Sequence, residues 1–270
     1  MIINHNMNAI NSQRQMYKTS TSQSKASEKL SSGLRINRAG DDAAGLAISE
    51  KMRGQVSGLN QASRNAQDGI SLIQTAEGAL DETHSMLQRL RTLAVQSSNG
   101  TYVSTDRANI QAEVDQLTAE ITEIAGKTEF NKMKLVNGST GTVDFQVGAN
   151  GSQKITISMQ SMAASALGVS SLSLSTASDA ESAIATIDDA INSVSEFRAK
   201  LGAVQNRLEH TISNVDNSAE NLQAAESRIR DTDMAKEMME FTRTNVLSQA
   251  TQSMLAQANA KPNQVLSLLQ

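Results

Sequence analysis

Two long stretches of the chain carry an apolar residue at every seventh position, and this repeat constrains the fold more than any other feature. A stripe with this spacing packs one helix against another along their whole length. A helix of about 50 residues would be about 75 Å long, too long for a compact globular domain. The sequence therefore predicts a mainly α fold built around a long antiparallel helical coiled-coil rod. The repeating positions are Met52, Leu59, Ala66, Ile73, Leu80, Leu87 and Ala94 in the first stretch, and Ile187, Val194, Leu201, Leu208, Val215, Leu222 and Ile229 in the second.

Each stripe has a companion row that is less regular. In the first stretch, Gly69 and Thr83 interrupt the row; in the second, Arg198 and Gln205 do. The other members of the two rows are Ala62, Ala76 and Leu90, and Ile184, Ile191, Ile212 and Ala219. Between the long helices a shorter one is expected over residues 110–124, where apolar residues alternate steps of four and three, and it should end near Gly126.

Composition supports a narrow bundle. The chain has one proline, no cysteine, no tryptophan and 2% aromatic residues. Because aromatic side chains normally supply much of a compact core, this core must be built from small aliphatic residues. The absence of cysteine excludes disulfides and thiolate metal sites.

A short region switches to period two. Residues 143–147 and 154–159 alternate apolar and polar side chains, and Asn150-Gly151 lies between them, so a small β-hairpin is expected near 130–160. Residues 161–178, rich in Ser, Ala and Thr, are expected to form a connecting loop.

The two ends of the chain are helix-compatible but have thin apolar stripes. Residues 5–34 and 235–258 carry scattered apolar side chains broken by Gln, Ser, Thr and Asn. Segments like these bury too little surface to offset their ordering entropy alone. We therefore expect them to fold against each other or against other copies, as terminal helices that form a second coiled coil.

Several function classes are disfavoured. Residues 1–40 carry a net charge of +5, but only Tyr17 supplies an aromatic ring nearby, so nucleic-acid binding is not expected. No stretch approaches the roughly 20 apolar residues of a membrane span, so membrane insertion is not expected. The start also lacks the charged and apolar regions of a secretory signal.

Catalytic and metal sites are also not expected. The three histidines (His5, His84 and His210) lack metal-ligand spacing, and Asp41-Asp42 fits a helix start. No catalytic or nucleotide-binding motif occurs. The sequence thus predicts no cofactor, no metal and no enzymatic activity.

Longer motifs at both ends resemble bacterial flagellins. The residues that carry the resemblance are Ile3-Asn4-His5-Asn6, SSGLRINRAGDDAAGLAI at 31–48, GAVQNRLE at 202–209, AESRIRDTDMA at 225–235, and the ending QAN at 257–259 with PNQVLSLL at 262–269. The resemblance covers essentially the whole chain. With only a short stretch near 160–178 where many flagellins insert outer domains, the chain is similar to a minimal core form of the family.

The resemblance implies a subunit that polymerises into the extracellular flagellar filament used for swimming motility. It implies that 1–42 and 235–270 form a D0-like coiled coil lining a channel, and that 43–234 form a D1-like helical rod. The implied partners are further copies of the chain, the flagellar type III export apparatus, a flagellin chaperone, filament cap and hook-junction proteins, and the host receptor TLR5. A hook-filament junction protein and a non-flagellar coiled-coil tether remain as alternatives.

The resemblance also points to particular residues. It assigns receptor binding to Arg89 and Leu93 in the stretch 87–96, with Glu113 as the acidic partner, and we expect Leu93 to be exposed. The alternative is a solvated Arg89 and a Leu93 that is covered by the helix expected over 110–124. It assigns polymerisation to apolar residues of both ends: Ile10, Leu30, Leu34, Met254, Leu255, Leu266, Leu268 and Leu269.

Overall fold

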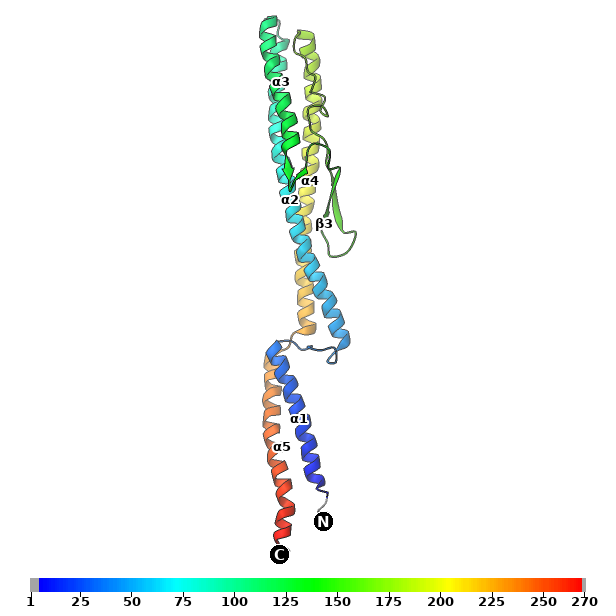
Figure 1. The fold of residues 1–270 in the computed structure, drawn as a ribbon, viewed down its shortest axis with the longest axis vertical. Helices are drawn as coiled ribbons and strands as arrows, with labels where there is room; N and C mark the ends of the chain where they lie inside the picture. Colours follow the sequence, from blue (N-terminus) through cyan, green and yellow to red (C-terminus); the bar gives the residue numbers. More distant parts are fainter. Residues whose placement is uncertain (1–4, 269–270) are drawn as a thin grey trace. The chain divides into compact units, whose positions relative to one another are not determined.

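The computed structural model describes residues 5–268, and side chains are described as far as residue 261. The described chain is mostly helical (Figure 1). It divides into two compact units: residues up to Gly54 together with those from Asn221 onward, and residues Gln55–Glu220. The helices are α1 (Met7–Ser32), α2 (Ala43–Ser98), α3 (Ser104–Lys127), α4 (Ala177–Arg230) and α5 (Met234–Leu268), and the strands are β1 (Glu129–Phe130), β2 (Met133–Lys134), β3 (Thr142–Gln146) and β4 (Lys154–Ser158).

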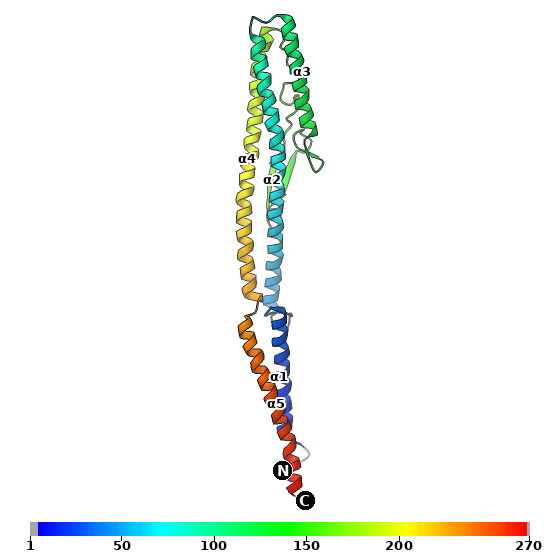
Figure 2. The ribbon, with the colours of Figure 1, turned by 90° about the vertical axis from the view of Figure 1, so that its left-hand side faces the viewer.

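The unit formed by Gln55–Glu220 is a bundle of three helices. α2 runs antiparallel to both α3 and α4, and the three lie side by side (Figure 2). Ion pairs bridge the neighbours: Arg91 of α2 binds Asp188 of α4 at 2.6 Å, and Arg198 of α4 binds Asp81 of α2 at 3.0 Å. The bundle confirms the mainly α fold with antiparallel packing of the two long helices.

The seven-residue stripes face the core of this unit, as predicted. Between Ala66 and Ala94, every stripe residue of α2 is fully buried, and the interrupting Thr83 is buried as well. The Thr83 hydroxyl donates to the Ala79 carbonyl at 2.9 Å, so burying it leaves no unpaired donor. The stripe of α4 is buried from Ile187 to Val215.

The companion row of α4 differs from the prediction. Ile184 and Ile191 are only half-buried, whereas Ala183, Ala190 and Phe197, each one residue before a position of that row, are buried. Arg198 lies at the flank, where it pairs with Glu77 and Asp81. Residues of the 161–175 segment belong to the same core as those of α2 and α4, and a Cβ on Gly168 would lie 3.8 Å from Thr186 of α4, so this segment is a second neighbour of α4 beside α2.

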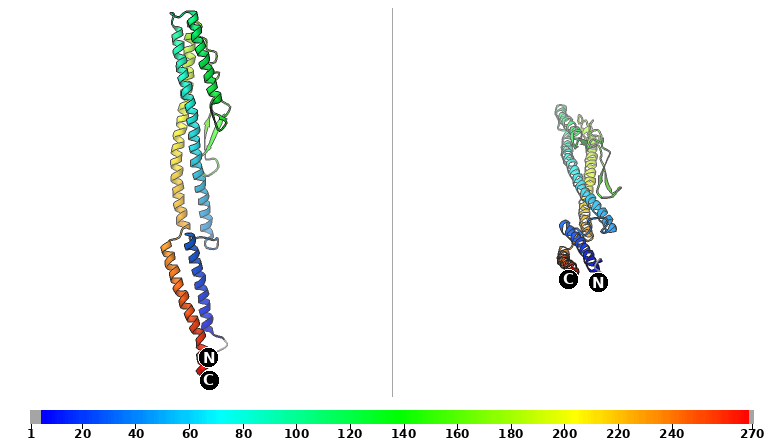
Figure 3. Two further views of the ribbon diagram at one scale, coloured as in Figure 1. Left: turned by 60° about the vertical axis from the view of Figure 1, so that its left-hand side comes forward. Right: turned by 60° about the horizontal axis from the view of Figure 1, so that its bottom comes forward.

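The predicted hairpin is present as β3 and β4. They pair antiparallel with Val143 opposite Ile157 and Phe145 opposite Ile155. The hairpin lies along α2 (Figure 3), where the backbone of Gly69 comes close to the ring of Phe145. A Cβ at position 69 would lie 3.0 Å from that ring, so glycine allows the close approach. A second antiparallel pair, β1–β2, was not predicted.

The stretch 161–178 is not merely a connecting loop. Met162, Ala164, Leu167, Val169 and Leu174 are buried in the shared core. The Ser97 hydroxyl donates to the Leu174 carbonyl at 2.8 Å, which ties the segment to the end of α2. Residues 161–176 contain no helix or strand, as expected of a connection, but their burial was not predicted, because these apolar residues follow neither period two nor a helical period.

Candidate assembly surface

The pair of terminal helices, α1 and α5, forms its own antiparallel contact (Figure 1). At one end, the Asn6 amide donates to the Ala258 carbonyl at 2.8 Å; at the other, Lys29 and Glu237 lie 3.9 Å apart. The Asn6 side chain also caps α1 by accepting from the Ala9 amide at 3.1 Å.

The inner seam of this pair is made of small residues. The buried positions are Thr19 and Ala26 on α1, and Thr244 and Ala258 on α5. They lie seven residues apart on α1 and fourteen apart on α5, as expected for a coiled coil. Both threonine hydroxyls donate to carbonyls of their own helix, so neither forms a hydrogen bond between the two helices. The seam therefore buries little apolar area.

The large apolar side chains of the pair lie on its outer faces instead. Tyr17 is 75% exposed, Met239 is 67% exposed and Val246 is 60% exposed. The other exposed large apolar residues of the two helices are Met7, Ile10, Met234, Met238, Leu247 and Met254. An isolated chain rarely presents so many such residues on one element without a partner to cover them.

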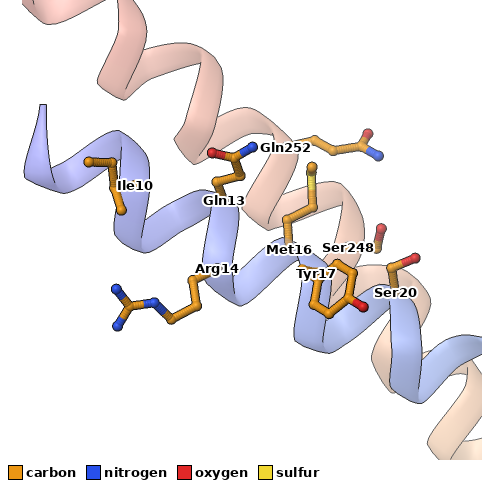
Figure 4. A pocket seen from close by; sticks show the side chains of 8 residues that line it. All are labelled: Ile10, Gln13, Arg14, Met16, Tyr17, Ser20, Ser248 and Gln252. Atoms are coloured by element: carbon orange, nitrogen blue, oxygen red, sulfur yellow. The ribbon is translucent and has the colours of Figure 1, made fainter.

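These outer residues line two open grooves. One, of about 610 Å³, lies between α1 and α5 and is lined by Ile10, Met16 and Tyr17 together with polar residues of both helices (Figure 4). The second, of about 530 Å³, lies on α5 and is lined by Met238, Met239, Val246 and Leu247, with Thr242 and Arg243. Both have the mixed apolar and polar lining of a surface that receives side chains from another protein.

Main-chain hydrogen bonds join the segments that precede α2 and follow α4. The Arg35 amide donates to the Arg230 carbonyl at 2.6 Å, and the Thr232 amide donates to the Gly33 carbonyl at 3.0 Å. The Arg35 guanidinium also donates to the Ile229 carbonyl. Arg230 in turn pairs with Glu50, and this hydrogen bond lowers the pKa of the Glu50 carboxyl. We call these contacts the clasp.

Several positions of the 31–48 motif have a structural reason. Gly33 ends α1 with a φ of 72°, a left-handed conformation that favours glycine. The Asp42 carboxylate accepts from the Gly45 amide at 2.9 Å at the start of α2, which confirms the helix-start interpretation for this residue. A Cβ on Gly45 would lie 2.8 Å from the buried Ile36 side chain.

Asp41 has a different role from Asp42. It accepts from the Arg38 amide at 3.1 Å and from the Asn37 amide, which closes the turn before α2. The hydrogen bond from the Arg38 amide is the main cause that lowers the pKa of the Asp41 carboxyl.

The predicted receptor stretch lies on α2 of the three-helix bundle. Arg89 and Glu113 are brought together, with 2.7 Å between a guanidinium nitrogen and a carboxylate oxygen, and both are partly exposed. The expectation that Leu93 is exposed is wrong: it is 2% exposed. Because α3 packs against the flank of α2, that flank is buried in addition to the seven-residue stripe. Val95, not Leu93, is the exposed apolar residue of the stretch.

The predicted polymerisation residues are spread over both helices. Ile10 and Met254 are exposed on the outer faces, while Leu30, Leu34 and Leu255 are half-buried. The side chains of Leu266 and Leu268 lie outside the described residues, as does Leu269 entirely. Sequence reasoning missed Tyr17, Met239 and Val246 as outward-facing positions, and it missed Arg35, Arg230 and Glu50 as a set.

None of the helices described has a stretch long and apolar enough to cross a membrane. Within the same residues, no group of three or more histidine, aspartate or glutamate side chains is arranged to hold a metal ion.

Models of one protein family match both ends of this chain. Residues 3–141 match the bacterial flagellin N-terminal helical region, and residues 184–269 match the bacterial flagellin C-terminal helical region. The chain is 60% identical to a flagellin of Halalkalibacterium halodurans and 51% identical to a flagellar filament 31.3 kDa core protein of Treponema maltophilum, in both cases over the full length of both chains.

A solved structure agrees with these matches. The crystal structure of Bacillus cereus flagellin is 34% identical, with a TM-score of 0.53, over 60% of this chain and 94% of that one. Both helical regions of the family are thus matched, and the alignments with full-length relatives leave neither end of the chain out. The chain belongs to the bacterial flagellins, the structural subunits of the flagellar filament.

Proposed function

We propose that α1 and α5 carry the contacts through which this flagellin polymerises, and that their outward apolar residues become buried between subunits. The observation that carries the proposal is the reversed distribution of side chains in the pair. Small residues such as Thr19 and Thr244 fill the inner seam, while Tyr17, Met239 and Val246 point outward.

Burial of these apolar side chains would stabilise the assembled state. Complete burial of one Met, Val or Leu side chain contributes about 1.5–3 kcal/mol. Among the described side chains of the two helices, nine large apolar residues are exposed, so even partial coverage by neighbouring subunits would supply much of the free energy of association. A contact between different faces of neighbouring copies does not close on itself, and it therefore builds a helical filament.

The proposal also assigns a role to each part of the chain. In this proposal, residues 1–42 and 235–270 act as the D0-like coiled coil, and 43–234 act as the D1-like rod. The function is structural and needs no catalytic activity or cofactor. The proposal also includes localisation in an extracellular filament and export through the flagellar type III apparatus. The proposed partners, taken from the family, are a flagellin chaperone and the cap and hook-junction proteins. The names of the relatives favour a filament subunit over a junction protein or a tether.

A pair of matched substitutions on α5 tests the assembly surface. Leu247→Asp places a charge among the residues of the α5 groove, whereas Gln249→Asp places the same charge two residues away, at an exposed polar position. Leu247→Asp should abolish or strongly reduce sedimentable filament, and Gln249→Asp should assemble close to the parent level. Equal assembly of the two variants would exclude this surface.

We also propose that the α2 stretch meets the host receptor TLR5 through Arg89 and Glu113. Their exposed ion pair supports the proposal, since a charged anchor at an interface sets both attraction and register. Arg89→Asp should weaken receptor binding by about 2–5 kcal/mol, the cost of removing one partner of a hydrogen-bonded charge pair that becomes buried on binding.

The swapped variant Arg89→Glu with Glu113→Arg is the matched control. It keeps an ion pair within the subunit but reverses both charges toward a receptor. If the swapped variant binds the receptor as the parent does, the pair has only a structural role. Binding is measured with purified receptor ectodomain, and the helix content of each variant is checked by circular dichroism.

A further inference from the structure

The exposed methionines of the described chain are all on the terminal helices. They are Met7 on α1 and Met234, Met238, Met239 and Met254 on α5. The remaining described methionines are half-buried or buried. This second group consists of Met16, Met52, Met86, Met133, Met159 and Met162.

Thioethers are the most readily oxidised side chains that this protein has. The sequence contains no cysteine and no tryptophan, so neither a thiol nor an indole competes for an oxidant. With hydrogen peroxide, a lone pair of the methionine sulfur attacks one peroxide oxygen and an S–O bond forms as the O–O bond breaks. The departing hydroxide takes the proton of the new S–OH group, which gives the sulfoxide and one water, so that sulfur is oxidised and the peroxide is reduced.

The change in polarity falls on the face that carries the assembly surface. Met238 and Met239 line the α5 groove beside Val246 and Leu247. A sulfoxide is a polar acceptor in place of an apolar group. The charged residue of that lining, Arg243, already pairs with Glu240 at 2.5 Å, so a sulfoxide there has to compete with this carboxylate for the guanidinium.

We propose that the exposed methionines of α1 and α5 are a sulfoxidation site through which peroxides block polymerisation of the free subunit. The inference rests on the proposed assembly surface. Subunits already in a filament have these thioethers covered and are spared. The three-helix bundle keeps its fold, because Met159 and Met162 are buried there. Enzymatic reduction of the sulfoxides restores competence, since this oxidation step is reversible.

The experiment treats the full-length monomer and the assembled filament with hydrogen peroxide. Sulfoxide at each methionine is measured by peptide mass spectrometry, and assembly is measured by sedimentation. In the monomer the five exposed methionines should oxidise first. The concentration needed for polymerisation should rise roughly tenfold or more, the usual effect of leaving one polar group unpaired in a buried contact. In the filament, oxidation at the same positions should be several-fold slower.

Two variants provide the control. Replacing the five exposed methionines by leucine keeps the apolar faces and should give a subunit that assembles before and after peroxide. Replacing Met86 and Met133 by leucine should leave the peroxide sensitivity unchanged, because those residues are half-buried in the bundle.

The outcomes separate this inference from the proposed function. If the five positions are oxidised and assembly is unaffected, while Leu247→Asp still blocks it, then the sulfoxidation site is excluded and the assembly surface stands. If neither oxidation nor Leu247→Asp affects assembly, the assembly surface itself is excluded. Persistent sensitivity of the five-leucine variant would place the damage elsewhere and overturn the inference.

Discussion

Truncation of Leu208 to alanine tests the packing of the long helices most severely. Leu208 lies on the seven-residue stripe of α4 and is 0% exposed, within the core of the three-helix bundle. Removing the buried methyl and methine groups should cost about 2–5 kcal/mol, because the transfer free energy is lost and a cavity remains. For a unit of this size, about 2–4 °C is lost per kcal/mol, so Tm should fall by roughly 4–20 °C.

The assay is thermal unfolding of the monomer followed by circular dichroism at 222 nm. Glu209→Ala is the matched control, because Glu209 is exposed on the same turn and its carboxylate accepts a hydrogen bond from Gln205 at 3.0 Å. That variant should change stability by less than about 0.5 kcal/mol. Equal Tm values for Leu208→Ala and Glu209→Ala would refute the assignment of the core face of α4.

Three further predictions concern other parts of the chain. Gly69→Leu should destabilise the bundle by about 1–3 kcal/mol because the ring of Phe145 occupies the space, whereas Gly78→Ala, with nothing near its Cβ position, should stabilise α2 by about 0.5–1 kcal/mol; denaturant titration measures both. The pKa of Glu50 is lowered from its ordinary 4.5 by Arg230, so the stabilisation by the clasp is present above pH 4.5 and lost as pH falls through the lowered value. Because intrinsic amide exchange slows as pH falls, the quantity to follow is the protection factor of the Arg35 amide: it should decrease on acidification, and Glu50→Gln should remove that pH dependence. Deleting residues 1–30 or 240–270 should leave the three-helix bundle folded but unable to polymerise; filaments of ordinary appearance from either truncated chain, seen by negative stain, would count against the proposed function.

The bundle was predictable because its signal is repetitive. Residues such as Ile73, Leu80 and Leu201 recur at a spacing that has one structural meaning, and the structure buries each of them. Leu93 shows the limit of that reasoning. A seven-residue stripe describes contact with one neighbour, but α2 has two, so the flank toward α3 is buried too.

The segment 161–178 and the terminal helices were less predictable, for different physical reasons. Val169 and Leu174 are buried by an irregular path that has no periodic signature. On α1 and α5, the thin apolar stripes were expected to pack against each other or against other copies, and within the subunit Thr19, Ala26 and Thr244 form the seam. The sequence shows on which face of a helix an apolar residue lies. It does not show whether that face packs against the same subunit or against another one.

The central claim is that the outer faces of α1 and α5 are covered when subunits assemble. Hydrogen exchange on monomer and filament, measured under the same conditions by mass spectrometry, tests it most directly. The account predicts that amides within residues 7–32 and 234–268 gain strong protection on assembly, while those buried in the core of the three-helix bundle, such as Leu80 and Leu201, change little. Filaments in which α1 and α5 exchange as fast as in the monomer would contradict it.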